Sequence, residues 1–156
     1  MRRKEREVTD MARIDEIISS CDCCRIALAD GTSAYIVPLN FGYERIEGKG
    51  IFYFHGAKVG RKIDLIQKNG YAGFELDTNH ILMRHEEACG HSFGYSSVVG
   101  SGKISLIDNM DEKKHALSLM MKQHTEQGNW QIPDKAVEAV GVMKLEVEEM
   151  CGKENL

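Results

Sequence analysis

The order of extended and helical patterns along the chain limits the folds open to it more than any other feature. Alternation and aromatic or β-branched residues mark strand-like runs at 25–29, 34–41, 51–55, 71–76, 95–107 and 140–147. Helical spacing is found at 11–21, 61–68 and 111–124. A regular strand–helix–strand alternation, the pattern of a parallel sheet, is missing. The chain is therefore predicted to be mainly β, an antiparallel barrel of about six strands with added helices.

Turn residues set the expected pairing of the early strands. The turn at 30–33 contains an Asp-Gly pair, whose backbone angles suit a hairpin between 25–29 and 34–41. A second glycine-rich turn, 48–50, returns the chain into 51–55. The three runs are therefore expected to be consecutive antiparallel strands.

Pro38 lies inside one of these strand-like runs. Alternation places Val37 and Leu39 on one face of the strand and Pro38 and Asn40 on the other. Because proline has no N–H to give to a β-ladder, Pro38 marks an edge or a bulge. The backbone beside it is expected to face something other than another strand.

Length and charge restrict the class of protein. A chain of 156 residues with 42% apolar residues is large enough for one domain with a real core, so residues 1–156 are expected to form a single domain. The formal net charge of -4 disfavours sequence-independent binding to nucleic acid. No run approaches the roughly 20 apolar residues of a membrane span, and no apolar signal core follows the basic N-terminus. A cytoplasmic protein is expected.

The five cysteines, an odd number, fit reduced thiols better than a disulfide framework. Cys21 and Cys24 have Cys-x-x-Cys spacing, and a loop expected at 77–93 holds Cys89 between two histidines, His85 and His91. A zinc-stabilised interaction protein is therefore one alternative. The favoured interpretation has no metal: Cys21 and Cys24 pack inward as small apolar groups.

The segment 51–62 carries the strongest functional signal. An aromatic strand ends on His55, a small-residue loop follows, and Arg61 and Lys62 open a helix. The positive end of the helix macrodipole disfavours cations at this position unless an anion offsets them. Free backbone N–H groups after Gly60 and two cationic side chains predict a site for a phosphate group. The alternative is a solvated Arg-Lys pair on a surface helix.

Several motifs occur in an order that is specific for one family. They are Met1-Arg2-Arg3-Lys4, Thr9-Asp10, the run Tyr35 to Tyr43, Phe54-His55-Gly56-Ala57, Gly60-Arg61-Lys62, Cys89, Tyr95-Ser96-Ser97-Val98, Gly100, Gly102, Glu112-Lys113 and Gly152-Lys153. With these motifs the chain resembles the 5-nitroimidazole resistance proteins. They are a branch of the pyridoxamine 5'-phosphate oxidase-like split-barrel flavoproteins. The resemblance covers nearly the whole chain.

The resemblance implies a six-stranded antiparallel split barrel that dimerises and holds FMN in a cleft between subunits. It assigns the FMN phosphate to Arg61 and Lys62, with His55 beside the isoalloxazine ring. The other residues that it implies for the cofactor site are Val37, Pro38, Leu39, Asn40, Gly56, Ala57, Ser97 and Val98. The phosphate site proposed from the residues alone coincides with the one that the resemblance implies.

The implied activity is the reduction of nitro groups on small heteroaromatic molecules. A flavin accepts a hydride and passes electrons on singly or in pairs. His55 would donate a hydrogen bond or a proton to the substrate or to the flavin edge. Its alternative role is that of a strand-end histidine bonded to backbone. The chain has no Gly-x-Gly-x-x-Gly, so NADH or NADPH would stack transiently on the flavin as the electron donor.

Three further points stay open. The first is turnover: a non-catalytic carrier or sensor that holds flavin, or haem near His55, is the main alternative to an enzyme. The second is Trp130, which either stacks over a flavin or anchors its loop. The third is an apolar stripe at 116–121, for which packing in the core or in a dimer is favoured over a cofactor face.

Overall fold

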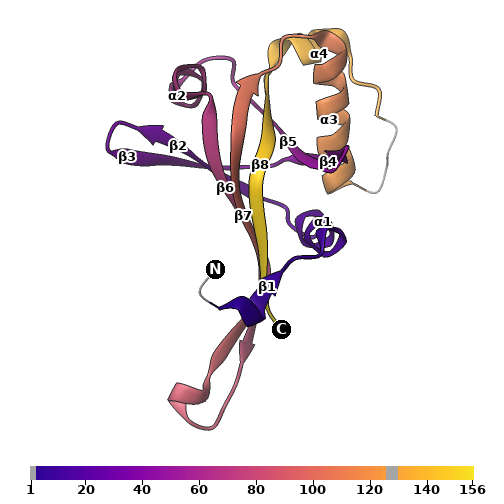
Figure 1. Ribbon diagram of the computed structural model, residues 1–156. Helices are drawn as coiled ribbons and strands as arrows, with labels where there is room; N and C mark the ends of the chain where they lie inside the picture. The colour runs from indigo at the N-terminus through magenta and orange to yellow at the C-terminus, as the bar shows by residue number, and fades with distance from the viewer. Residues whose placement is uncertain (1–2, 126–129) are drawn as a thin grey trace.

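The computed structural model describes residues 3–125 and 130–156, so Met1, Arg2 and the segment 126–129 lie outside the described residues. The described strands form one antiparallel sheet with the order β3-β2-β6-β7-β8-β5-β4, and β1 pairs with β8 (Figure 1). The strands are β1 (Glu7–Val8), β2 (Cys24–Asp30), β3 (Ser33–Leu39), β4 (Gly42–Ile46), β5 (Lys49–Gly56), β6 (Tyr71–Met83), β7 (Ser92–Leu106) and β8 (Gly141–Asn155). The predicted mainly β, antiparallel class is confirmed.

The expectation of six strands is wrong, because the described residues form an eight-stranded sheet, and that sheet is not closed. The end strands of the order are β3 and β4, which do not pair with each other. Pro38 lies in β3, so the predicted edge position is confirmed. Opposite Pro38, on its paired side, stands Arg25 of β2. The free edge of β3 therefore exposes backbone that no neighbouring strand in the described sheet occupies.

The predicted pairing of 34–41 with 51–55 is also wrong. β5 pairs instead with β4 and β8. The physical reason is a tight turn at Glu47 and Gly48, whose φ angles of 49° and 82° are both positive. Two successive positive φ angles give the two-residue hairpin turn whose twist matches that of antiparallel strands. The turn commits β5 to the short strand β4, which sequence patterning did not resolve.

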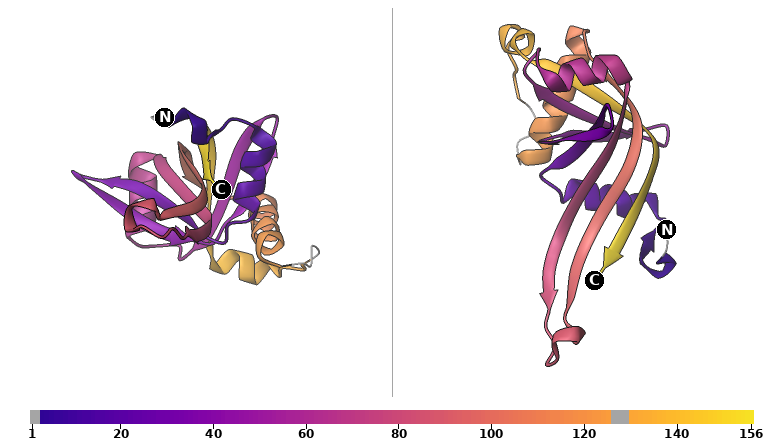
Figure 2. Two further views of the ribbon diagram at one scale, coloured as in Figure 1. Left: turned by 90° about the horizontal axis from the view of Figure 1, so that it is seen from below. Right: turned by 90° about the vertical axis from the view of Figure 1, so that its left-hand side faces the viewer.

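The segment 77–93, expected to be a loop, is mostly the far half of a long hairpin. β6 continues to Met83, a 3₁₀ turn spans Ala88–Gly90, and β7 returns from Ser92. This hairpin extends beyond the rest of the chain (Figures 1 and 2). Its side chains are largely exposed on both faces, so burial imposes no alternation on the sequence. That is why periodicity failed to reveal these strands.

Helices cover parts of the sheet and its upper end. They are α1 (Met11–Ser19), α2 (Arg61–Asn69), α3 (Met110–His124) and α4 (Asp134–Ala139), preceded by a 3₁₀ turn at Lys4–Arg6. Side chains cap two of these helices at their N-termini: the Asp10 carboxylate accepts from the Ala12 N–H at 3.1 Å, and the Asn109 side chain accepts from the Glu112 N–H at 3.0 Å. Gly70 ends α2 in the left-handed conformation, with φ 63°. The short helix α4 was not predicted.

Close backbone contact explains the two glycines noted in β7. A Cβ on Gly102 would lie 2.1 Å from the Glu146 carbonyl oxygen, and one on Gly100 would lie 2.4 Å from that of Glu149. The ladder between β7 and β8 shifts register at Ser101 and Gly102. Only glycine allows the two strands to approach this closely.

Strand β5 separates two apolar layers. Phe52 and Phe54 belong to the main core, which also takes in the buried Cys21 and Cys24 as predicted. Tyr53 faces the other way, into a smaller cluster between the sheet and α3. Because side chains alternate along a strand, one face of β5 packs on the main core and the other faces α3. Both faces contribute to the candidate site at the end of the strand.

Among the described residues, no helix combines the length and the apolarity that crossing a bilayer requires.

Candidate functional site

The predicted anion site lies where β5 ends and α2 begins, at the end of the sheet opposite the hairpin tip (Figure 1). Gly60, the N-cap, has φ 122°, a conformation that L side chains rarely adopt. Its carbonyl accepts from the N–H groups of Ile63 at 2.8 Å and Asp64 at 3.1 Å. No partner within the described residues takes the N–H groups of Arg61 and Lys62. The first turn of α2 therefore presents two free donors.

Arg61 already has a carboxylate partner. Its Nε donates to Oδ2 of Asp30 at 2.9 Å, and its Nη2 donates to the same oxygen. The guanidinium carbon lies 4.5 Å from the centroid of the Tyr35 ring. Hydrogen bonds and cation–π contact together fix the plane of the guanidinium. Sequence reasoning missed Asp30, because only the fold brings the end of β2 to the start of α2.

Lys62 differs from its neighbour. Neither a hydrogen bond nor an ion pair joins its ammonium to any described residue, and partial burial lowers its pKa below the ordinary value. A Cβ on Gly56 would lie 2.6 Å from Lys62 Nζ, so the missing side chain makes the room that the ammonium occupies. A partly desolvated cation without a counterion favours an anion.

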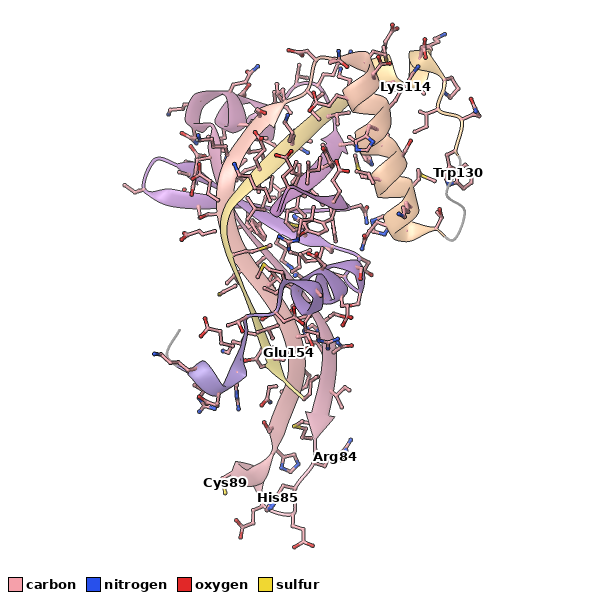
Figure 3. The ribbon with its side chains drawn as sticks, turned by 45° about the vertical axis from the view of Figure 1, so that its right-hand side comes forward. Arg84, His85, Cys89, Lys114, Trp130 and Glu154 are labelled. Carbon is pink, nitrogen blue, oxygen red and sulfur yellow. The ribbon has the colours of Figure 1, made fainter. Side chains whose placement is uncertain are left out.

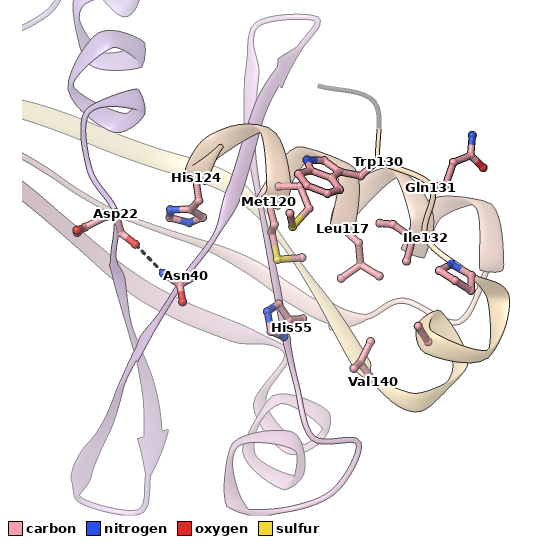
Figure 4. A pocket seen from close by; sticks show the side chains of 13 residues that line it. Asp22, Asn40, His55, Leu117, Met120, His124, Trp130, Gln131, Ile132 and Val140 are labelled. Carbon is pink, nitrogen blue, oxygen red and sulfur yellow. Dashed lines mark hydrogen bonds between the residues drawn. The ribbon is translucent and has the colours of Figure 1, made fainter. Parts of the chain in front are cut away.

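A cavity of about 690 Å³ lies on the α3 side of the same strand end (Figure 4). Two of the predicted site residues, Asn40 and His55, line it. The other lining residues come from the connection before β2, from α3, and from residues 130–140, which include α4. They are Asp22, Leu117, Met120, Met121, His124, Trp130, Gln131, Ile132, Pro133, Ala136 and Val140. Most were not singled out from the sequence, because their shared wall exists only once α3 and α4 pack together.

Hydrogen bonds hold the walls of this cavity in place. Asn40 Nδ2 donates to the Asp22 carbonyl at 3.0 Å. Trp130 Nε1 donates to Thr125 Oγ1 at 3.2 Å, and that hydroxyl donates to the Met121 carbonyl at 2.7 Å. Trp130 is thus anchored to the end of α3 and also contributes to a cavity wall. The hydrogen bond to Thr125 supports the loop-anchoring role considered from the sequence, and stacking over a flavin stays a prediction.

His55 lines the cavity without a partner in the described part of the chain, where its ring makes no hydrogen bond. The alternative of a strand-end histidine bonded to backbone therefore finds no support. Because successive strand residues alternate, His55 lies on the α3 side of β5, whereas Gly56 faces Lys62. The cavity therefore lies on one side of the end of β5. The pair Arg61 and Lys62, here called the cationic corner, lies next to it on the other side.

The remaining predicted residues are spread more widely. Val37 and Leu39 are half-buried against the main core, and Pro38 is exposed on the edge strand. Ser97 is half-buried in the middle of β7, and the Val98 side chain is fully buried in the core. Neither Ser97 nor Val98 lines the cavity, so within one chain they are not brought to His55. Ala57 lies in the loop between β5 and α2, where its carbonyl packs near Gly141.

The fold separates the residues of the zinc alternative. Cys21 and Cys24 are buried, and burial raises the pKa of the Cys21 thiol to about 12. Cys89 and His85 lie exposed at the tip of the hairpin (Figure 3), whereas Cys21 and Cys24 belong to the main core. Within residues 3–125 and 130–156, no group of three potential ligands is placed to hold a metal ion.

Comparison with known proteins places the chain in a family. The family model described as pyridoxamine 5'-phosphate oxidase matches residues 10–154. The chain belongs to this family. The resemblance inferred from the sequence motifs is therefore confirmed. No curated protein matches the chain.

Solved structures agree with the family assignment. A candidate 5-nitroimidazole antibiotic resistance protein from Bacteroides thetaiotaomicron is 33% identical, with 95% of this chain and 86% of that chain covered and a TM-score of 0.82. Flavocytochrome Anf3 from Azotobacter vinelandii is 18% identical, with 100% and 72% covered and a TM-score of 0.81. A FAD and haem binding protein from Mycobacterium smegmatis is 16% identical, with 96% and 73% covered and a TM-score of 0.80. The last two likenesses concern the fold.

Proposed function

We propose that this member of the family binds FMN and reduces small nitroheterocycles with electrons from NADH or NADPH. One observation carries the proposal: the cationic corner of Arg61 and Lys62 adjoins a cavity into which His55 opens. A phosphate site next to a cavity that admits an electron acceptor suits a flavin nucleotide better than it suits free phosphate. The 33% identical relative, named for 5-nitroimidazole resistance, supports the choice of substrate.

The residues at the corner fit a phosphate ester. Lys62 supplies a cation without a described counterion, the first turn of α2 supplies backbone donors, and the missing side chain of Gly56 makes room for the ammonium. Charge-assisted hydrogen bonds to phosphate are the stronger kind in proteins. Arg61 would hold the group through the edge of its guanidinium that Asp30 does not occupy. The edge backbone at 37–40 would support the ring.

Bound FMN would supply hydride acceptance and electron transfer. The chain's own residues would bind and orient the cofactor and the substrate. His55, with no competing hydrogen bond to the described residues, is free to donate a hydrogen bond or a proton to the substrate. NADH or NADPH would approach transiently, since the chain has no dinucleotide-binding glycine motif.

We also propose a homodimer, with Ser97 completing the cofactor cleft of the partner copy. Large apolar side chains are exposed on the sheet, Ile36 of the edge strand β3 at 61% and Val99 of the central strand β7 at 44%. Exposed apolar surface favours association. Sedimentation at several protein concentrations with and without FMN tests the dimer. A monomer at all concentrations that still binds FMN would remove Ser97 from the site.

A visible absorption spectrum of the purified protein tests the cofactor. FMN gives two bands, in the blue and the near ultraviolet, whereas haem gives a single intense Soret band. Haem is the second candidate, because His55 and His124 line one cavity and two fold relatives are a flavocytochrome and a haem binding protein. A flavin spectrum followed by anaerobic bleaching with NADH or NADPH and re-oxidation by a nitroimidazole supports the reductase. Bleaching without re-oxidation favours a carrier.

Replacing His55 with Ala tests its role directly. The His55 ring makes no hydrogen bond to the described residues, so the substitution should leave the fold and FMN affinity unchanged. Turnover should fall about 10²-fold or more, the usual contribution of a positioned general acid. Stopped-flow kinetics of the oxidative half-reaction give the measurement. Loss of the fold, seen by circular dichroism, would instead assign His55 a structural role.

A further inference from the structure

Most residues that line the cavity beside His55 are not among the proposed flavin contacts. Only Asn40 and His55 of its lining belong to the cofactor residues expected from the sequence. The opposite wall comes from α3, α4 and the segment 130–133, and it includes the single tryptophan of the chain. A wall built by elements outside the flavin contacts points to a second occupant.

Trp130 has the properties of a stacking surface. Its side chain is held at one edge by the hydrogen bond to Thr125, and it remains 40% exposed. An indole fixed at its N–H edge leaves its faces free for contact with a planar ring. Rigid aromatic walls bind planar ligands with little loss of side-chain entropy. The position of Trp130 over the cavity therefore favours a flat aromatic molecule.

Two histidines are among the polar residues of the cavity, with Asp22, Asn40 and Gln131. His124, at the end of α3, packs edge to face against the ring of Phe41, with 6.2 Å between the two ring centroids. It makes no hydrogen bond to the described residues. His55 is likewise available. The rest of the lining is mostly apolar, and the carbonyl of Asp22 is taken by Asn40. Such a lining suits an uncharged ring that carries oxygen acceptors.

We propose that this cavity is the acceptor site of the reductase, specific for uncharged planar aromatics with nitro or quinone oxygens. Trp130 stacks against the ring, and His124 and His55 donate hydrogen bonds to its oxygens. The role of the bound molecule as an electron acceptor rests on the proposed function, but its binding to the cavity does not require flavin. Trp130 and His124 would determine which acceptors fit.

Binding to the flavin-free protein gives the first test. Titration with 1,4-naphthoquinone should quench the fluorescence of the single tryptophan to saturation. Equilibrium dialysis should show about tenfold weaker binding for Trp130→Ala and for His124→Ala, the size of one aromatic or hydrogen-bond contact. Trp130→Phe should retain most of the affinity. The matched controls Phe93→Ala and His80→Ala, on the projecting hairpin, should bind as the native protein does.

Steady-state kinetics of the FMN-loaded protein give the second test. The ratio of kcat/KM for naphthoquinone to that for ferricyanide should fall about tenfold in Trp130→Ala. Ferricyanide is a compact anion that needs no stacking wall. An unchanged ratio, or unsaturable quenching that equals the controls, would overturn the proposal. So would weaker FMN binding in Trp130→Ala with an unchanged ratio, because the cavity would then hold the flavin ring itself.

The two proposals fail differently. Native protein that takes up no flavin but binds naphthoquinone at Trp130 would defeat the reductase and keep an aromatic site. Native protein that binds FMN and reduces nitroimidazoles while Trp130→Ala behaves as native would defeat only the acceptor site. Circular dichroism of each variant shows whether it has folded, and His124→Ala serves as the test if Trp130→Ala does not fold.

Discussion

The two halves of the cationic corner differ in how their charge is balanced. On the β3 side, Arg61 is fixed by Asp30 and Tyr35, so much of its charge is already compensated inside the chain. On the β5 side, Lys62 lies in the space left by Gly56 and has no described counterion. Adjacent basic residues are therefore not equivalent. The fold makes one a positioned hydrogen-bond donor and the other the main source of unbalanced positive charge.

The largest effect is expected from Lys62→Met, which removes the uncompensated charge and keeps most of the side-chain volume. FMN affinity should fall by about 1.5–3 kcal/mol, the value of a hydrogen bond to a charged group. Riboflavin, which lacks the phosphate, should bind the variant and the native protein equally. Isothermal titration with both ligands checks this. Equal losses for FMN and riboflavin would place the phosphate elsewhere.

Arg61→Ala should cost less, about 1 kcal/mol of FMN affinity, because Asp30 already takes one edge of the guanidinium. The double substitution of Arg61 and Lys62 by Ala should cost a few kcal/mol. A double-mutant cycle with Asp30→Asn separates the contributions. Asp30→Asn should have an effect only when Arg61 is present. If Arg61→Ala proves more harmful than Lys62→Met, the proposed difference between the two cations is wrong.

The pH dependence of FMN binding should sharpen the same comparison. Burial lowers the pKa of Lys62 below 10.5 in the free protein, whereas a bound phosphate raises it. FMN affinity should therefore fall as the pH rises through the lowered pKa, and Lys62→Met should lack this fall. The stability of the protein without FMN should change in the opposite direction with pH. Lys62 holds its proton more tightly in the unfolded chain than in the folded one, so the free energy of unfolding rises with pH between the lowered pKa and 10.5.

Gly56→Ala should have the smallest effect. The new methyl group would lie 2.6 Å from Lys62 Nζ, and the flexible lysine end can move aside. We expect FMN affinity to fall by a few tenths to about 1 kcal/mol, since the ammonium is displaced but not removed. Combining Gly56→Ala with Lys62→Met should add nothing further. Additive losses would mean that Gly56 serves the strand rather than the lysine.

Local signals were read correctly from the sequence. The edge position of Pro38 and the hairpin turn at 30–33 each depend on a few neighbouring residues. Such features require no knowledge of tertiary pairing. The start of α2 at Arg61 was predicted for the same reason.

What the sequence could not give depended on distant contacts. Asp30 meets Arg61 only after β2 and α2 are placed, and the cavity wall exists only when α3 and α4 pack beside β5. The projecting half of the β6–β7 hairpin hides from periodicity because neither of its faces is buried. Strand pairing was misread at β4, where a two-residue turn decides the partner. In each case burial or pairing carries information that residue order alone does not.

The alternation of β5 has a genetic consequence. Because His55 and Gly56 are consecutive and face opposite sides, inserting or deleting one residue before them would exchange the two sides at once. His55 would then face Lys62, and Gly56 would face the cavity that Trp130 lines. Changes of length in this family are therefore expected to accumulate in the connection 57–60 and not within 51–56.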